Sequence, residues 1–431
     1  MSIKINGGKS NVKRIISLPG DKSIAHRSLI IGSLPKGEYK IENFPNSLDC
    51  LATLECMKKI GIKARKNSDE IYISSPGYEN FIKDIDEINA MNSGTTARLL
   101  SGLLSGNAIK CTLQGDSSLS NRPMERIITP LTLMGAKLEH NNNKLPLKFC
   151  IGEKLNGIKY ELPVASAQVK SCILIAGFLA KGNTEIVEKI QTRDHTERMF
   201  KHLGAKIQIF ENKITIENSP IMCKDIFIPG DVSSAAFIIA CVLLGDGCEV
   251  TIKNVLLNKN RRQYLEILKL MGADIEIIDQ GKVNEEEVGN IIARSSNLKG
   301  INLTSEVIPA IIDEIPVIAL LAAFSTGQTV IEGIEELKHK ESDRGQAIVH
   351  NLKILDVDCE VKNNTLIING KDRYIDKNVE MNSFNDHRIS LAFLCSAMRN
   401  KGWIIIDNWE CTEISFPNSI NYFQEFLNII K

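Results

Sequence analysis

The chain alternates between apolar stretches of helical length and short β-branched stretches. Segments that open with small polar residues and continue as apolar, helix-like runs recur at intervals of about 70 residues, beginning near Ser23, Ser93, Ser166, Ser233, Asp313 and Asp386. Most of these runs are followed by a Gly-containing stop and a β-branched run, as in GNTEIVEKI (182–190). A polar start, an apolar run and a Gly stop are typical of a helix, and the β-branched run predicts a strand.

A second, shorter element recurs between these helices. It has the pattern of an amphipathic helix that ends at or near Gly and leads into a strand, in KKIGIKA (58–64), TLMGAKL (132–138), KHLGAKI (201–207), KLMGADI (269–275) and, in weakened form, KILDVDC (353–359). Gly adopts the left-handed conformation that ends a helix at least cost. The pattern therefore predicts six helix–strand–helix–strand units that bury their faces by packing on one another.

The two halves of the chain also resemble each other. LPGDKSIAHRSLIIGSLPKG (18–37) and IPGDVSSAAFIIACVLLGDG (228–247) both place Pro-Gly-Asp before small polar residues, an apolar run and Gly. They lie about half a chain apart, which predicts two similar domains of three units each, with boundaries near 19–21 and 229–231. Residues 1–18 precede the first turn and are candidates for pairing with the second half.

Composition narrows the class of protein. The 431 residues include 52 Lys and Arg and 52 Asp and Glu, and 43% are hydrophobic, which is ordinary for a globular protein. The balanced charge argues against a protein whose whole surface binds nucleic acid or an anionic membrane. MSIKINGGKS lacks the features of a secretory signal, and Ile315 to Phe324 is about half the length of a membrane span. The eleven cysteines contain no CxxC pair. We therefore expect a cytoplasmic protein with reduced thiols, no metal and no cofactor.

Basic residues stand where the predicted helices begin. Ser, Asn and Asp at these starts are explained by ordinary capping, but the helix dipole disfavours cations there. Five basic residues nevertheless lie in or near the first turn of a predicted helix: Lys22, Arg27, Arg98, Lys170 and Arg388. Further arginines lie in the turn-like segments SNRPMER (120–126), QTRDHTER (191–198) and LKHKESDR (337–344). If the helix starts converge, these groups would bind anions, phosphates above all, in one cleft.

Two acidic positions stand out among these bases. Asp313 opens the run DEIPVIALLAAF, and Glu341 lies between Lys340 and Arg344 in HKESDR. A helix cap and a salt bridge would explain them, but a carboxylate weakens an anion site unless it moves protons, which favours general acid–base roles. The chain has no P-loop, dinucleotide-binding fingerprint or HExxH helix, so Walker NTPases, Rossmann dehydrogenases and zincins have no support.

At this point the motifs resemble a known family. LPGDKSIAHRS, NSGTTAR, NRPM, SAQVKS, RDHTER, KESDR and NDHR occur in this order, and together they are similar to the EPSP synthases (3-phosphoshikimate 1-carboxyvinyltransferases), in particular to their second class. The resemblance implies an α/β fold of two similar domains, each of three βαβαββ units, an inside-out α/β barrel. It places residues 20–229 in one domain, and residues 1–19 with 230–431 in the other.

The resemblance also implies a reaction and a set of site residues. The enolpyruvyl group of phosphoenolpyruvate would be transferred to the 5-hydroxyl of 3-phosphoshikimate, by a monomer without nucleic-acid or membrane partners. By position in the motifs, 3-phosphoshikimate would be bound by Lys22, Ser23, Arg27, Ser166, Gln168, Arg193, Asp313 and Lys340. Phosphoenolpyruvate would be bound by Lys22, Gly94, Arg122, Gln168, Arg344 and Arg388. Asp313 would accept the hydroxyl proton, and Glu341 with Lys22 would handle the proton at the methylene carbon.

Some positions depart from the family pattern, and two other functions stay open. Ile414 stands where a lysine is expected near the C-terminus, and Ala167 replaces the second serine of a Ser-Ser-Gln pattern. The sister transferase that acts on UDP-N-acetylglucosamine has Lys-Asn in place of Lys22-Ser23 and a loop cysteine, whereas the nearest cysteine here is Cys111, outside the NRPM loop. A non-catalytic anion-binding repeat protein would not need Asp313 and Glu341.

Overall fold

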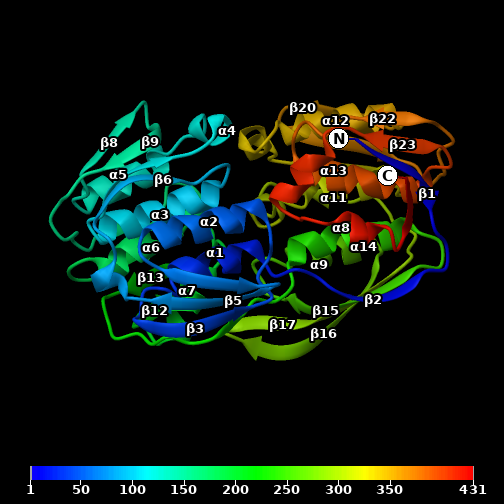
Figure 1. Ribbon diagram of the computed structural model, residues 1–431. Coiled ribbons are helices and arrows are strands. Elements are labelled where there is room, and N and C mark those ends of the chain that lie inside the picture. Colours follow the sequence, from blue (N-terminus) through cyan, green and yellow to red (C-terminus); the bar gives the residue numbers. More distant parts are fainter. Residues whose placement is uncertain (1, 431) are drawn as a thin grey trace. The chain divides into compact units, whose positions relative to one another are not determined.

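The computed structural model describes residues 2–430 and divides into two compact units (Figure 1). Unit 1 comprises Met1–Pro19, Pro229–Gly281 and Glu287–Lys431, and unit 2 comprises Gly20–Ile228 and Lys282–Glu286. The main crossings between the units fall at the two Pro-Gly-Asp turns. The short segment Lys282–Glu286 also belongs to unit 2, which the sequence pattern did not predict.

Residues 2–430 form six four-stranded sheets, and unit 2 contains three of them. Each sheet has one parallel pair of strands followed by two antiparallel neighbours. In spatial order they are β14 (Ile226–Phe227), β3 (Gly37–Glu42), β5 (Glu70–Ser75) and β4 (Lys63–Asn67); β6 (Asp84–Asn89), β7 (Lys110–Gln114), β9 (Lys144–Phe149) and β8 (Leu138–Asn141); and β10 (Lys159–Glu161), β11 (Thr184–Val187), β13 (Lys213–Ile216) and β12 (Ile207–Phe210).

Unit 1 repeats this arrangement and draws two strands from the start of the chain. Its sheets are β16 (Asp274–Val283), β17 (Glu286–Arg294), β15 (Glu249–Leu256) and β2 (Lys13–Ser17); β18 (Asn302–Leu303), β19 (Gly327–Glu332), β21 (Thr365–Gly370) and β20 (Asp358–Lys362); and β22 (Val379–Met381), β23 (Trp403–Ile406), β1 (Ile3–Gly8) and β24 (Leu427–Ile430). β2 pairs in parallel with β15, and β1 lies between β23 and β24. The first residues of the chain thus pair with strands of the second half.

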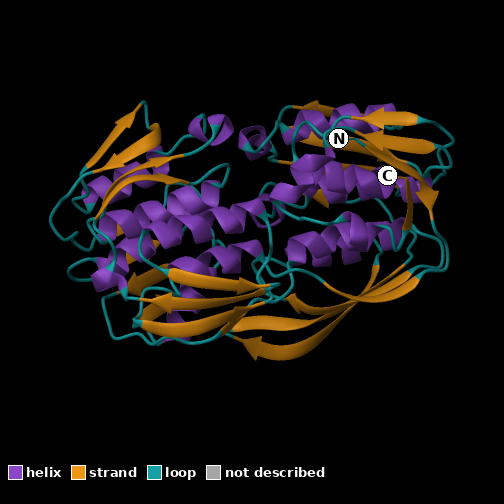
Figure 2. Cartoon of the chain, in the orientation of Figure 1, coloured by secondary structure: helices purple, strands orange, loops and turns teal. Residues whose placement is uncertain are grey.

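Within each unit the helices lie inside and the sheets outside (Figure 2). Unit 2 contains α1 (Lys22–Ile30), α2 (Leu48–Lys59), α3 (Gly94–Gly106), α4 (Ser117–Ser120), α5 (Glu125–Leu133), α6 (Ala167–Leu179) and α7 (His195–Leu203). Unit 1 contains α8 (Val232–Leu244), α9 (Gln263–Leu270), α10 (Ile308–Ile311), α11 (Ile315–Ala323), α12 (Arg344–Ile354), α13 (His387–Leu394) and α14 (Ile420–Phe423). Every residue of α8 and of α11 is buried, as expected of helices surrounded by other elements. The inside-out α/β fold is confirmed.

The short helices end where the Gly pattern predicts. Gly61, Gly135, Gly204 and Gly272 follow α2, α5, α7 and α9, and each has a positive φ between 90° and 112°. In the weakened fifth copy Asp356 occupies the same position with φ 54°. The sixth unit has no such copy, and its second helix is replaced by a 3-10 helix, Trp409–Ile414, and the single turn α14.

One expected helix start is displaced. The run from Asp313 was predicted to open a helix, but α11 begins at Ile315, and the short helix α10 ends two residues before Asp313. The cap position is Glu314, and its side chain makes no capping hydrogen bond. Asp313 therefore lies in the turn between two helices, and capping does not explain it. Among residues 2–430, no helix is long and apolar enough to cross a membrane.

Candidate active site

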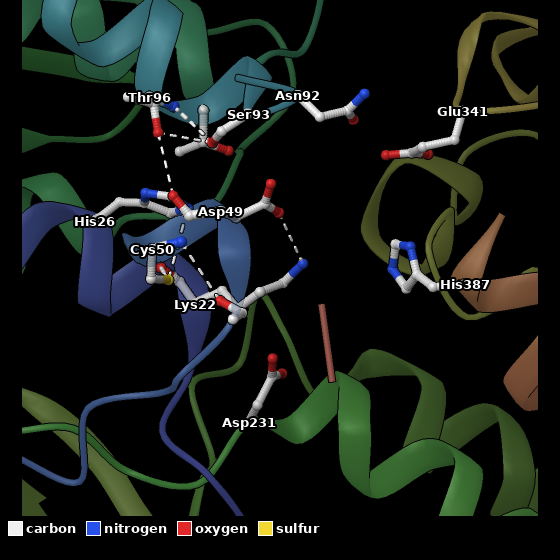
Figure 3. A network of polar contacts seen from close by, with 12 residues as sticks. Lys22, His26, Asp49, Cys50, Asn92, Ser93, Thr96, Asp231, Glu341 and His387 are labelled. Atoms are coloured by element: carbon white, nitrogen blue, oxygen red, sulfur yellow. Dashed lines mark hydrogen bonds and ion pairs between the residues drawn. The ribbon is translucent and has the colours of Figure 1, made fainter. Parts of the chain in front are cut away.

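The first turn of α1 carries Lys22, the residue that the sequence places in both substrate roles. Asp21 caps the helix by accepting a hydrogen bond from the backbone N–H of Ile24 at 3.0 Å. Lys22 is the first helical residue, and its Nζ lies 3.3 Å from Oδ2 of Asp49, in the first turn of α2. Both side chains are 19% exposed, so this pair is reachable from solvent (Figure 3). The sequence pattern did not indicate Asp49 as the partner of Lys22.

A chain of buried polar side chains joins α1, α2 and α3 within their first two turns (Figure 3). Nδ1 of His26 lies 2.7 Å from the hydroxyl of Thr53, which lies 2.6 Å from the hydroxyl of Thr96. Thr96 in turn donates to the hydroxyl of Ser93, the cap of α3, at 2.7 Å. These contacts hold the first two turns of the three helices against one another.

Burial, and to a smaller extent the neighbouring charges of Lys22 and Arg27, lower the pKa of His26 to about 3. Because the pKa of His26 is lower in the folded chain than in the unfolded chain, the unfolded chain binds more protons between about pH 3 and about pH 6.5. The stability contributed by neutral His26 is present above about pH 6.5 and is lost as the pH falls, by at most about 1.4 kcal/mol per pH unit.

We predict that replacing His26 removes part of this pH dependence. Urea unfolding measured from pH 7 to pH 5 should show a shallower loss of stability for His26→Gln than for the parent protein. His140→Gln, at an exposed histidine, serves as the control and should leave the slope unchanged. Equal slopes for the parent and His26→Gln would contradict the buried neutral state of His26.

A second cluster in unit 2 brings together Gly94, Arg122 and Gln168, three residues assigned to phosphoenolpyruvate. Arg98 donates from Nη1 to Oε1 of Gln168 at 2.7 Å, and Gln168 donates from Nε2 to Thr95 at 2.9 Å. A Cβ atom built on Gly94 would lie 2.8 Å from Nη1 of Arg98 and 3.4 Å from Nη1 of Arg122. Gly94 therefore leaves room for two guanidinium groups, which is the arrangement expected of an anion site.

The other predicted residues of unit 2 occupy helix starts and one loop. Ser166 caps α6, where its hydroxyl accepts from the backbone N–H of Val169 at 3.4 Å. Ser23 is partly exposed in the first turn of α1, and its carbonyl accepts from Nη1 of Arg27 at 2.7 Å. Arg193 is partly exposed in the loop before α7. All three residues thus lie at a helix start or in the loop that leads into a helix.

The expectation of an anion at each basic helix start is wrong for Lys170. Its side chain is 1% exposed, and Nζ lies 2.6 Å from Oε1 of Glu197 and 3.0 Å from Oε2 of Glu188. Burial lowers the pKa of Lys170, but the two carboxylates outweigh this and raise it. Burial raises the pKa of Glu197, which the charge of Lys170 opposes. Lys170 balances internal charges, a role that the spacing of the sequence did not reveal.

We predict that Lys170→Met lowers the free energy of unfolding by about 3–5 kcal/mol, because two buried carboxylates lose their cation. Urea denaturation checks this. The control is Lys159→Met, which removes an exposed pair with Glu185 and should change stability by less than about 1 kcal/mol. A loss of similar size in both variants would show that Lys170 does not balance buried charge.

In unit 1 Arg344 is surrounded by three carboxylates. Nε of Arg344 lies 2.8 Å from Oδ2 of Asp386, Nη1 lies 3.3 Å from Oδ1 of Asp313, and Nη2 lies 2.6 Å from Oε2 of Glu341. Although burial lowers the pKa of Arg344, these three carboxylates raise it above its ordinary value. Asp386 is fully buried and also caps α13. Asp313 and Glu341 retain 16% and 32% exposure, so they can meet a ligand.

Arg388 lies beside the same turn. Nη1 of Arg388 donates to the backbone carbonyl of Asp313 at 2.8 Å and lies 3.5 Å from Oε1 of Glu314, while Nη2 lies 3.8 Å from Oδ2 of Asp313. Glu314 is 2% exposed and accepts from the hydroxyl of Ser233, to which the buried Arg261 also donates. The predicted residues Asp313, Glu341, Arg344 and Arg388 therefore form one cluster.

Sequence reasoning missed several residues of this cluster. Asp386 was recognised only as a helix start, and Glu314 and Arg261 were not singled out. The available signal for Glu314 was an acidic residue between Asp313 and the apolar run that follows. Lys340 follows a 3-10 helix, Glu335–His339, and directly precedes Glu341. Ile414 ends another 3-10 helix and is partly exposed. It offers no charge where the family pattern has lysine.

Each unit thus contains a cluster with bases at the helix starts, and the cluster of unit 1 adds partly exposed carboxylates beside two arginines. The fold is that of the enolpyruvyl transferases. The enolpyruvyl transferase NikO from Streptomyces tendae, 14% identical, has the same fold with a TM-score of 0.78 over 100% of this chain and 98% of its own.

The family follows from closer relatives. The family model for EPSP synthase (3-phosphoshikimate 1-carboxyvinyltransferase) matches residues 7–423. A 3-phosphoshikimate 1-carboxyvinyltransferase from Clostridium tetani is 55% identical over 99% of this chain and 98% of its own, and one from Petrotoga mobilis is 42% identical over 97% and 98%. An EPSP synthase structure from Acinetobacter baumannii is 36% identical, with a TM-score of 0.91 over 100% of this chain and 99% of its own. The chain belongs to the EPSP synthase family.

Proposed function

We propose that the protein transfers the enolpyruvyl group of phosphoenolpyruvate to the 5-hydroxyl of 3-phosphoshikimate and releases inorganic phosphate. The observation that carries this proposal is the cluster of unit 1, in which the partly exposed carboxylates Asp313 and Glu341 lie against Arg344. Relatives that align with nearly the whole chain are named for this reaction. Arginines recognise the anionic donor, and the carboxylates move protons.

Unit 2 supplies most of the groups that hold the substrates. Lys22, Ser23, Arg27, Ser166, Gln168 and Arg193 bind 3-phosphoshikimate in this proposal, together with Asp313 and Lys340 of unit 1. Lys22, Gly94, Arg122 and Gln168 bind phosphoenolpyruvate with Arg344 and Arg388. The hydrogen bond from Arg98 to Gln168 supports this assignment, because it fixes the side-chain amide of Gln168, which is proposed to bind both substrates.

The chemistry follows from the carboxylates. The 5-hydroxyl oxygen bonds to C2 of phosphoenolpyruvate while Asp313 takes the hydroxyl proton, and Glu341 with Lys22 delivers a proton to C3, which becomes a methyl group. The C2–O bond to phosphate then breaks, and Glu341 takes a proton back from C3, which restores the double bond. Arg344 and Arg388 stabilise the charge that gathers on the phosphate as it leaves. The ion pairs of Arg344 with Asp313 and Glu341 keep both carboxylates beside the donor site.

The choice of acceptor separates this proposal from the sister reaction. Purified protein is incubated with phosphoenolpyruvate and either 3-phosphoshikimate or UDP-N-acetylglucosamine, and the products are identified by mass spectrometry. We expect an enolpyruvyl ether only with 3-phosphoshikimate. A product formed only from the nucleotide sugar would assign the sister reaction instead.

We further propose that the enzyme acts as a monomer in the cytoplasm. All eleven cysteines are free, and nine of them are buried, which suits a reducing compartment. Each unit also builds its own cluster from a single chain. Gel filtration of the active protein tests the proposed state, and an active dimer would contradict it.

A further inference from the structure

The first turn of α7 contains side chains to which no role has been given, although one of them touches a proposed substrate-binding residue. Arg27 uses all three of its nitrogens within unit 2. Nε donates to the hydroxyl of Thr196 at 2.7 Å, Nη2 donates to the hydroxyl of Ser171 at 2.6 Å, and Nη1 donates to the carbonyl of Ser23. Thr196 therefore holds the guanidinium from the side of α7.

The hydroxyl groups around Arg27 form a directed network. Ser171 donates its proton to the carbonyl of Ala167 at 2.7 Å, so in the 2.6 Å contact between Ser171 and Thr196 the donor is Thr196. The hydroxyl of Thr196 then has its acceptor lone pairs directed at Nε of Arg27. Thr196 and Ser171 are fully buried, and Arg27 is 2% exposed. A hydrogen bond to a charged group at such depth is costly to lose.

The residues on either side of Thr196 are each held by a buried partner. Nδ1 of His195 lies 2.7 Å from Oε1 of Glu286, and these side chains are 1% and 4% exposed. On the other side, Glu197 forms the buried pair with Lys170 at 2.6 Å. The turn that carries Thr196 is thereby fixed from two directions, by α6 and by the segment that contains Glu286.

Glu286 comes from an unusual place. It begins β17, and the tip of the β16–β17 hairpin, Lys282–Glu286, is the one segment of this hairpin that clusters with unit 2. Further contacts hold the tip on α7 and on the segment before α8: Arg198 donates to the carbonyl of Glu285, Lys201 pairs with the carboxylate of Glu285 at 2.9 Å, and Asn284 donates to the carbonyl of Phe227 at 2.7 Å.

We infer that Thr196 is a positioning residue for Arg27, and that Glu286, through His195, fixes the turn that presents Thr196. Both residues are buried, and in this inference neither touches substrate. Their effect is to orient the guanidinium toward 3-phosphoshikimate, so the inference rests on the proposed function. It predicts that the affinity for the acceptor depends on these residues, while the affinity for the donor does not.

Thr196→Val tests the first step, because it keeps the shape of the side chain and removes the hydroxyl. We expect the KM for 3-phosphoshikimate to rise about 10-fold, with the KM for phosphoenolpyruvate and kcat within about twofold of the parent. Thr196→Ser restores the hydroxyl and should restore the KM. Calorimetric titration with 3-phosphoshikimate should give the same ratio of Kd values.

Glu286 is tested with a neighbouring control. Glu286→Ala removes the acceptor of His195 and should raise the KM for 3-phosphoshikimate several-fold, whereas Glu286→Gln keeps an oxygen acceptor and should recover most of it. Glu285→Ala removes a carboxylate from the same tip, where the partner Lys201 is 64% exposed, and should leave the KM unchanged. Thermal melts of all variants show whether a change reflects unfolding.

The outcomes are distinct. A rise in both KM values together, a fall in kcat alone, or a lower melting temperature with unchanged KM would each show a merely structural role and overturn the inference. If the parent protein makes product while Thr196→Val keeps the parent KM, the inference fails and the proposed function stands. If the parent neither binds 3-phosphoshikimate nor makes product, the proposed function fails and the inference falls with it.

Discussion

Asp313→Asn should lower kcat by roughly 10³-fold, because an amide cannot take the proton of the attacking hydroxyl. The substitution keeps the shape of the side chain and an oxygen that can still accept from Arg344, which lies 3.3 Å away. Binding of 3-phosphoshikimate should therefore persist with a Kd of the same order. Steady-state kinetics and calorimetric titration of the same preparation measure the two quantities.

This variant also separates an enzyme from a simple anion-binding protein. A binder has no use for a proton acceptor, so Asp313→Asn would leave its only activity intact. Glu306→Gln, at an exposed acidic residue of the same unit, is the control and should turn over like the parent. Full turnover by Asp313→Asn would remove Asp313 from the proposed mechanism.

Lys22→Met should lower kcat/KM by roughly 10²–10³-fold, because one ammonium group is proposed to touch both anionic substrates and to assist the proton at C3. Lys22 stands at the first helical position of α1, where the helix dipole disfavours a cation. Its pair with Asp49 is partly exposed, so the pair adds about 0–1 kcal/mol at most. The free energy of unfolding should therefore change little.

Activity and stability together make this test specific. Lys66→Met, at an exposed lysine of the same unit, is the matched control and should retain parent kinetics. A loss of activity in Lys22→Met with a parent-like melting curve supports the proposed role. A variant that keeps its kcat/KM would show that Lys22 serves only its pair with Asp49.

The fold was largely predictable because its signals are local. Polar caps, apolar runs and Gly stops recur at fixed intervals, and four of the five predicted stops have Gly with positive φ. The pairing of β1 and β2 with the second half followed from the position of the first Pro-Gly-Asp turn. The tip Lys282–Glu286 was not predictable, because its assignment to unit 2 depends on contacts with α7 about 90 residues earlier in the chain.

The residue types of the candidate site could be predicted from the sequence, but the ion pairs between its side chains could be predicted less well. The basic helix starts suggested anions, and the structure joins Asp313, Glu341, Arg344 and Arg388 in one cluster. The same argument was wrong at Lys170, because the sequence does not show that Glu188 and Glu197 converge on it. A charge beside a helix start can serve a ligand or a buried partner, and only tertiary packing separates the two.

Phosphate release is the most direct test of the central claim. Purified protein is mixed with 3-phosphoshikimate and phosphoenolpyruvate, and inorganic phosphate is followed with time while each substrate is omitted in turn. We predict steady release with both substrates present and none when either is absent. Absence of release from folded protein with both substrates, or release that does not require 3-phosphoshikimate, would contradict the proposed transfer.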